Sequence, residues 1–145
     1  MFYGEYEHTI DRKGRLIIPS KFREVFKEHY IEKFYVTRGL DGCLFVFTED
    51  EWKNQESKFK NMSFTKQESR NFNRMFFAGA VDVLPDKQGR FIIPPYLKDY
   101  AQIKRDTVII GVSNRIEIWD SKNWGEFYST SNESFERIAE NLIIT

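Results

Sequence analysis

Apolar and polar residues alternate in two short segments near the start of the chain, and the same pattern returns 75 positions later. Residues 3–10 and 15–18 predict two strands joined by a turn at residues 11–14, because Asp accepts backbone hydrogen bonds in turns and Gly adopts a positive φ. Residues 86–89 predict the same turn in the second occurrence. We expect the cations of each turn to project from the tip of a hairpin.

Further patterns predict helices and two more hairpins. Pro19 and Pro94 each end a strand, since proline donates no ladder hydrogen bond, and they predict short helices at 20–27 and 95–100. The spacings Thr48–Glu51 and Thr65–Glu68 are typical of capping boxes and predict helices at 49–59 and 66–75. Paired apolar segments predict hairpins at 34–48 and 107–120, and helical spacing predicts an amphipathic C-terminal helix that contains Phe135, Ile138, Ala139 and Leu142. The fold class is α+β, mainly β with helices.

The chain contains an internal repeat. Residues 11–19 read DRKGRLIIP and residues 86–94 read DKQGRFIIP, an offset of 75 that falls to 72 further along, where Gly39 matches Gly111 and Trp52 matches Trp124. The two repeats span 1–75 and 76–145. A unit of this size buries too little surface to be stable alone. We therefore expect both halves to pack as one body about a pseudo-twofold axis.

Charge is balanced over the whole chain but not along it. Lys and Arg number 22, as do Asp and Glu, so no global positive field marks a strongly basic nucleic-acid binder. Residues 11–27 nevertheless hold six cations and two carboxylates, a net of +4, and residues 86–98 hold three cations and one carboxylate, a net of +2. Any nucleic-acid site must therefore be local, and the first repeat is the stronger electrostatic candidate.

Residues that carry catalysis or hold metals are sparse. The single cysteine, Cys43, excludes an intrachain disulfide, is typical of a reducing cytoplasm and lies in an apolar strand pattern, where we expect it to be buried. His8 and His29 fall in different predicted elements, away from any ligand-spaced cysteine. Phosphate-binding glycine loops and nucleophile-elbow motifs are also missing from the sequence. We predict no enzymatic activity, no catalytic residue, no metal and no cofactor, and we expect no membrane association, because no apolar run approaches about 18 residues.

The repeated turn is the candidate site. Arginine presents a planar fork suited to the O6/N7 edge of guanine, so Arg15 and Arg90 are predicted to contact bases, and the neighbouring cations to contact phosphates: Arg12, Lys13 and Lys87. Four residues are assigned structural roles in the turns: Asp11, Gly14, Asp86 and Gly89. An alternative stays open, in which each Asp and Arg form a local ion pair that fixes the turn and contacts nothing else. Gln88 replaces Lys13 in the second repeat, which favours a weaker or purely architectural contact there.

The doubled D-x-x-x-R motif, each copy followed by an apolar triplet and Pro, resembles the MraZ family, as does the GVSNRIEIWD stretch at 111–120. The resemblance implies a swapped-hairpin, AbrB-like β-barrel with both half-barrel units on one chain. It also implies a ring-like homo-oligomer and a cytoplasmic, nucleoid-associated bacterial transcription regulator that binds repeated promoter elements of the division and cell-wall gene cluster. Hairpins displayed around a ring favour double-stranded DNA with direct repeats.

A second function remains an alternative to DNA binding. The basic turns could grip an acidic protein, and the family resemblance also implies an RNA methyltransferase of the same gene cluster as a partner. Salt dependence and competition by unrelated DNA distinguish a DNA-binding regulator from such a protein-interaction module.

Overall fold

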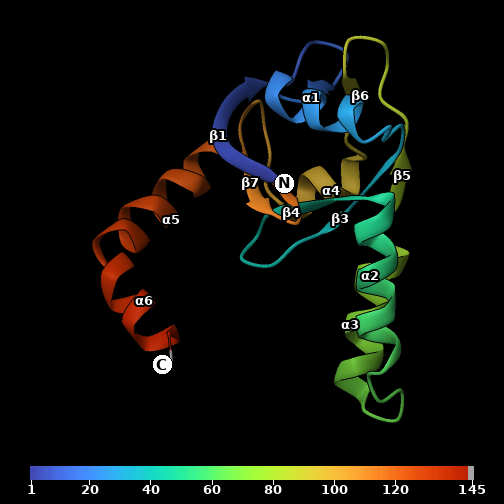
Figure 1. Ribbon diagram of the computed structural model, residues 1–145, viewed down its shortest axis with the longest axis vertical. Coiled ribbons are helices and arrows are strands. Elements are labelled where there is room, and N and C mark those ends of the chain that lie inside the picture. The colour runs from blue at the N-terminus through green and yellow to red at the C-terminus, as the bar shows by residue number, and fades with distance from the viewer. Residues whose placement is uncertain (144–145) are drawn as a thin grey trace.

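A computed structural model describes residues 1–143. Its strands form a six-stranded antiparallel sheet and a separate two-stranded ribbon (Figure 1). In the sheet the order is β1 (Phe2–Thr9), β7 (Asp106–Ser113), β8 (Ile116–Asp120), β4 (Leu44–Thr48), β3 (Phe34–Arg38) and β5 (Val81–Val83); in the ribbon β2 (Arg15–Ile17) pairs with β6 (Arg90–Ile92). The predicted α+β class is confirmed.

The two repeats exchange their first strands. Strand β1 pairs with β7 of the second repeat, β5 pairs with β3 of the first, and β2 pairs with β6 across the repeats. The expectation that residues 11–14 form the tip of a hairpin is therefore wrong in its pairing, because the strands on either side of this turn belong to different sheets. Alternation of apolar residues reveals which segments are strands with one buried face, but not which strands become neighbours.

The strand registers confirm the predicted pseudo-twofold arrangement. Leu16 lies directly opposite Phe91, its equivalent at an offset of 75, and Phe45 lies opposite Glu117, its equivalent at an offset of 72. The axis therefore passes through the centre of the β2–β6 ribbon and between β4 and β8 in the large sheet. Hydrogen-bonded strands form two sheets around a shared core rather than one continuous closed ladder.

One apolar core joins the ribbon to the large sheet. Leu16 and Phe91 point inward from the ribbon and meet Phe34 and Ile118 of the sheet, with the Phe34 and Phe91 ring centroids 5.2 Å apart. Two short helices, α1 (Ser20–Glu28) and α4 (Pro95–Tyr100), begin directly after Pro19 and Pro94 as predicted, and they cover the core with Phe22, Phe26 and Leu97. This core contains residues of both repeats, so neither repeat holds the whole of it.

Four further helices form two projections from this body (Figure 1). The first is a helical hairpin of α2 (Glu49–Lys60) and α3 (Gln67–Ala78), and the second, the C-terminal arm, consists of α5 (Ser121–Glu133) and α6 (Phe135–Leu142). The cap at Thr48 is confirmed, because its hydroxyl accepts the Glu51 N–H at 3.3 Å. The cap predicted at Thr65 is wrong: α3 begins after Lys66, and the Thr65 hydroxyl bonds to the Ser63 hydroxyl at 2.7 Å.

Candidate nucleic-acid interface

The first turn is organised by one carboxylate. Asp11 Oδ1 accepts the backbone N–H groups of Lys13 and Arg15, both at 2.9 Å, while Oδ2 accepts Nε of the Arg15 side chain at 2.7 Å. Gly14 adopts φ +79°, and its N–H donates to the Asp11 carbonyl at 3.0 Å. The D-x-x-x-R spacing thus closes a compact turn and attaches the arginine to it.

The second turn repeats this geometry with one addition. Asp86 accepts the N–H groups of Gln88 and Arg90 at 2.9 Å and Nε of Arg90 at 2.8 Å, and Gly89 adopts φ +80°. In addition, Nη2 of Arg90 donates to the side-chain oxygen of Gln88 at 2.5 Å. Two side-chain hydrogen bonds therefore hold the guanidinium group of Arg90, whereas one holds the guanidinium group of Arg15.

Both carboxylates stay ionised in these surroundings. The pKa of Asp11 lies below its ordinary value, first because the Arg15 N–H donates to it and also because of the Arg15 side chain, and the pKa of Asp86 is lowered in the same way by Arg90. The local ion pairs expected under the structural alternative are thus present. However, each pair uses Nε, and the Nη groups of Arg15 donate no hydrogen bond within residues 1–143. Asp11 therefore orients Arg15, and the Nη edge of the Arg15 guanidinium can still bind an anion or a base.

The ribbon register brings the two arginines onto one face. Arg15 pairs with Ile92 and Arg90 pairs with Ile17, so these four side chains share one side of the ribbon, because side chains alternate along a strand. Leu16 and Phe91 occupy the opposite side and are buried. The outward side combines two positioned guanidinium groups with two isoleucines, of which Ile92 is 59% exposed.

The remaining predicted cations lie at the turns beside this face. Arg12, Lys13 and Lys87 are all exposed, and Figure 1 shows both turns at the same end of the molecule, next to α1. The structure therefore brings together all five cations that the sequence singled out.

Three residues of this region were not singled out by their sequence. Ile17 and Ile92 could have been found from the period-two alternation of the segments RLI and RFI, which places them on the arginine side. Arg23 is different: from α1 it donates through Nε to the Ile18 carbonyl at 3.0 Å and through Nη1 to the Gln88 carbonyl at 3.4 Å. It links the first repeat to the second turn, a contact across 65 positions that no local pattern reveals.

Within residues 1–143, no cluster of three or more His, Cys, Asp or Glu side chains is close enough to hold a metal. Cys43 is fully buried, as predicted, and burial raises the pKa of its thiol.

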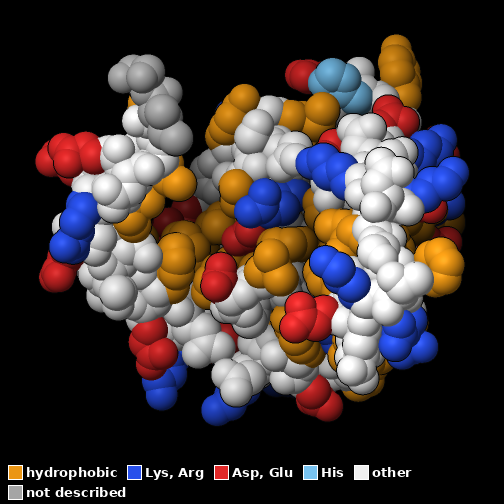
Figure 2. Space-filling model, turned by 90° about the horizontal axis from the view of Figure 1, so that it is seen from below, with side chains coloured by type: hydrophobic (Ala, Val, Ile, Leu, Met, Phe, Trp, Pro, Cys, Tyr) orange, Lys and Arg blue, Asp and Glu red, His pale blue; other side chains and the backbone are white. Residues whose placement is uncertain are grey.

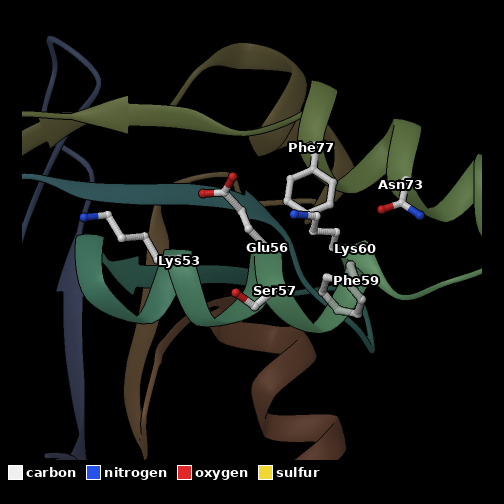
Figure 3. Close-up of a pocket in the computed structure, with 7 residues that line it drawn as sticks. All are labelled: Lys53, Glu56, Ser57, Phe59, Lys60, Asn73 and Phe77. Carbon is white, nitrogen blue, oxygen red and sulfur yellow. The ribbon is translucent and has the colours of Figure 1, made fainter.

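A groove of about 600 Å³ between α2 and α3 is lined by Lys53, Glu56, Ser57, Phe59, Lys60, Asn73 and Phe77 (Figure 3). None of the helices that the structure describes is both long and apolar enough to cross a bilayer.

The doubled, strand-exchanged unit with a charged turn in each half corresponds to a family of known proteins. A family model described as "MraZ protein, putative antitoxin-like" matches residues 1–75 and again residues 76–144. The match is made once per repeat and covers nearly the whole chain, so the chain belongs to the MraZ family. This is a family of regulator-like, non-enzymatic proteins.

Proposed function

We propose that the chain is a sequence-specific DNA-binding transcription regulator, cytoplasmic and nucleoid-associated, that acts on repeated promoter elements of the division and cell-wall gene cluster. The observation that carries this proposal is the convergence of Arg15 and Arg90 on the outward face of the β2–β6 ribbon. A two-stranded antiparallel ribbon fits the major groove of B-DNA, and arginine forks read guanine there.

The parts of the face have distinct roles in this mechanism. Arg15 binds the O6/N7 edge of a guanine through its Nη groups, while Asp11 acts through Arg15 as a positioning residue, because a carboxylate alone would be repelled by phosphate. The outward isoleucines are suited to contact thymine methyl groups. Exposed cations at the turns contact phosphates: Arg12, Lys13 and Lys87.

Affinity comes from several copies acting together. One turn with two or three cations binds DNA weakly, whereas linking many weak contacts in a ring-like homo-oligomer raises the effective concentration by orders of magnitude. Turns displayed around a ring meet the duplex in the same orientation, so the preferred site contains direct repeats about one helical turn apart. A chain of zero net charge can then hold DNA through local charge alone.

Fluorescence anisotropy with the DNA upstream of the chain's own gene tests the proposal. Arg15→Ala should lose about 1–3 kcal/mol of specific binding, the range for a bidentate base contact, because the fork is removed. Arg74→Lys, which removes an exposed guanidinium group on α3 far from the ribbon but keeps its charge, is the control and should bind like the wild type. Circular dichroism should show that both variants are folded. Normal binding by folded Arg15→Ala would leave the ion pair a purely structural role.

A second experiment changes the DNA instead of the protein. Inserting about 5 bp between two direct repeats rotates one element to the opposite face of the duplex and should weaken binding strongly, while about 10 bp should cost less. The slope of log affinity against log salt should exceed that of a single turn, at roughly 0.9 per phosphate neutralised. Equal affinity for unrelated DNA and for the repeats would contradict sequence-specific recognition, and the absence of binding to either DNA would favour an acidic protein partner instead.

A further inference from the structure

The C-terminal arm carries an apolar surface that nothing in residues 1–143 buries. On α6, Phe135, Ile138 and Leu142 lie on one face at helical spacing and are 70%, 43% and 74% exposed. On α5, Phe127 and Tyr128 pack against Trp124 and are still 39% and 50% exposed. The amphipathic helix predicted here is confirmed, but its apolar face is not part of the core. Contiguous exposed apolar surface on a water-soluble body marks an interaction site.

The corresponding helices of the first repeat show what covers such a face. There α3 folds back along α2, and Phe59 packs against Phe72 and Phe76 with ring centroids 4.8 and 5.2 Å apart. Six residues, 61–66, separate the two helices and permit this reversal. In the second repeat Ser134 alone separates α5 from α6, so α6 cannot fold back along α5. Its apolar face requires a partner from outside its own repeat.

A second exposed apolar surface lies where α3 meets the body. A groove of about 350 Å³ between α3, α4 and the β3–β4 turn is lined mainly by apolar groups, among them Leu40, Phe72, Met75 and Tyr100. Leu40 and Met75 are 61% and 52% exposed. At this groove, Arg38 donates through Nη1 to the Met75 carbonyl at 2.9 Å and lies 5.6 Å from the Tyr100 ring centroid, so its charge is already engaged within the fold.

We infer that α6 of one copy docks in the Leu40–Met75 groove of a second copy. This inference rests on the proposed assembly of several copies and names the surfaces that join them. Both surfaces are apolar, and the helical segments that carry them differ in net charge: residues 49–78, which span α2 and α3, hold six cations and five carboxylates, a net of +1, whereas residues 121–143 hold two cations and four carboxylates, a net of −2. Figure 2 shows Lys and Arg side chains over the α2–α3 hairpin and apolar side chains along the arm.

The geometry makes the contact head-to-tail. The arm projects from the body apart from α3, which forms one wall of the groove (Figure 1), so a copy that receives a neighbour's arm still offers its own arm to the next copy. A contact between two different surfaces is heterologous and closes into a ring when the rotation between copies allows it. The same contact therefore supplies the repeated display of turns on which DNA avidity depends.

Cross-linking with a short bis-maleimide tests the contact directly. Ile138→Cys and Met75→Cys are co-expressed as full-length chains with different tags, and native Cys43 does not interfere because it is fully buried. We expect a two-chain product that carries both tags, and no such product when Met75→Cys is replaced by Ser63→Cys, an exposed position outside the groove. Neither single variant should cross-link to itself.

Other outcomes would overturn the inference in distinguishable ways. Cross-linking of Ile138→Cys to itself would indicate a symmetric arm-to-arm contact, and an intrachain product in the Ile138→Cys/Met75→Cys double variant would show that the arm folds back on its own groove. The mass of the wild-type particle, measured by light scattering, distinguishes a failure of this docking contact from a failure of the proposed function. If the wild-type chain forms a multi-subunit particle without the expected product, these surfaces are wrong but the assembly stands. A wild-type mass of 17.4 kDa would refute both.

Discussion

The two D-x-x-x-R turns share a backbone and differ in what surrounds it. Around Gly14 of the first turn a side chain would meet no atom within 4 Å, whereas Gly89 of the second turn is buried beneath Arg23. Lys13 adds a cation to the first turn, and its counterpart Gln88 instead accepts a hydrogen bond from Arg90. The repeat equivalent of Arg23 is Lys98, and within residues 1–143 it donates no side-chain hydrogen bond to the first turn.

This difference shows how one motif can serve two purposes. The first turn is open, more positive and holds its arginine at one point, so it is suited to meet an external anion. The second turn is braced from α1 and holds its arginine at two points, so it contributes more to the architecture of the ribbon. Because β2 and β6 pair directly, a rigid second turn also fixes the position of the first.

The largest expected effect of this comparison is on stability. Gly89→Ala should cost about 3 kcal/mol, because alanine at positive φ is strained by roughly 1–2 kcal/mol and its methyl group must displace Arg23 and weaken that residue's hydrogen bonds. Gly14→Ala meets no neighbouring atom, carries only the backbone strain and should cost about 1–2 kcal/mol. Urea unfolding of both variants measures the difference. Equal losses would mean that Arg23 does not brace the second turn.

Exchanging the residues that differ between the turns should produce a smaller effect on DNA binding. Lys13→Gln removes one phosphate-contacting cation from each copy, so the slope of log affinity against log salt should fall by about 0.9 for every copy that contacts the DNA, whereas Gln88→Lys adds a cation and releases Nη2 of Arg90, so the slope should rise. Anisotropy titrations at several salt concentrations measure both slopes. Identical slopes in both variants would show that neither side chain lies near the DNA.

The smallest expected effect is a change in the pKa of Asp11. The pKa of Asp11 is lowered on folding, so its contribution to stability is present above the ordinary carboxyl pKa and is lost as pH falls through the lower, folded value. Arg15→Ala keeps the backbone N–H, the largest cause, and removes the side-chain bond, so the pKa of Asp11 should rise part of the way. Carbon-detected NMR should show this rise while the pKa of Asp86 stays constant. A shift at both sites would mean that the variant disturbs the whole ribbon.

Sequence patterns predicted which segments form strands and helices better than they predicted which strands pair with each other. Apolar alternation located the strands to within a few residues, but the hairpin at residues 11–14 was wrong, because β1 and β2 pair with the other repeat. The segment that forms α5, SKNWGEFYSTSNE, was not predicted although Trp124, Phe127 and Tyr128 lie at helical spacing, because Gly125 and the Ser, Thr and Asn residues around them have low helix propensity. The Thr65 cap failed because the Ser63 hydroxyl is its partner.

The same limit applies to the candidate site. The Asp–Arg spacing of four is local, so the ion pair could be predicted as an alternative from the sequence. The shared face of Arg15 and Arg90 depends on the register between strands 75 positions apart, and the bracing role of Arg23 depends on a contact across 65 positions. Both are set by tertiary packing.

Protection of guanine N7 from dimethyl sulfate tests the central claim most directly, because N7 lies in the major groove where the ribbon is proposed to bind. Wild-type protein on the promoter repeats should protect guanines at intervals of about one helical turn, and folded Arg15→Ala, at concentrations that restore full occupancy, should lose protection at particular guanines. Unprotected guanines beneath bound wild-type protein, or the same protection with Arg15→Ala, would contradict the assignment of Arg15 and the ribbon face to base recognition.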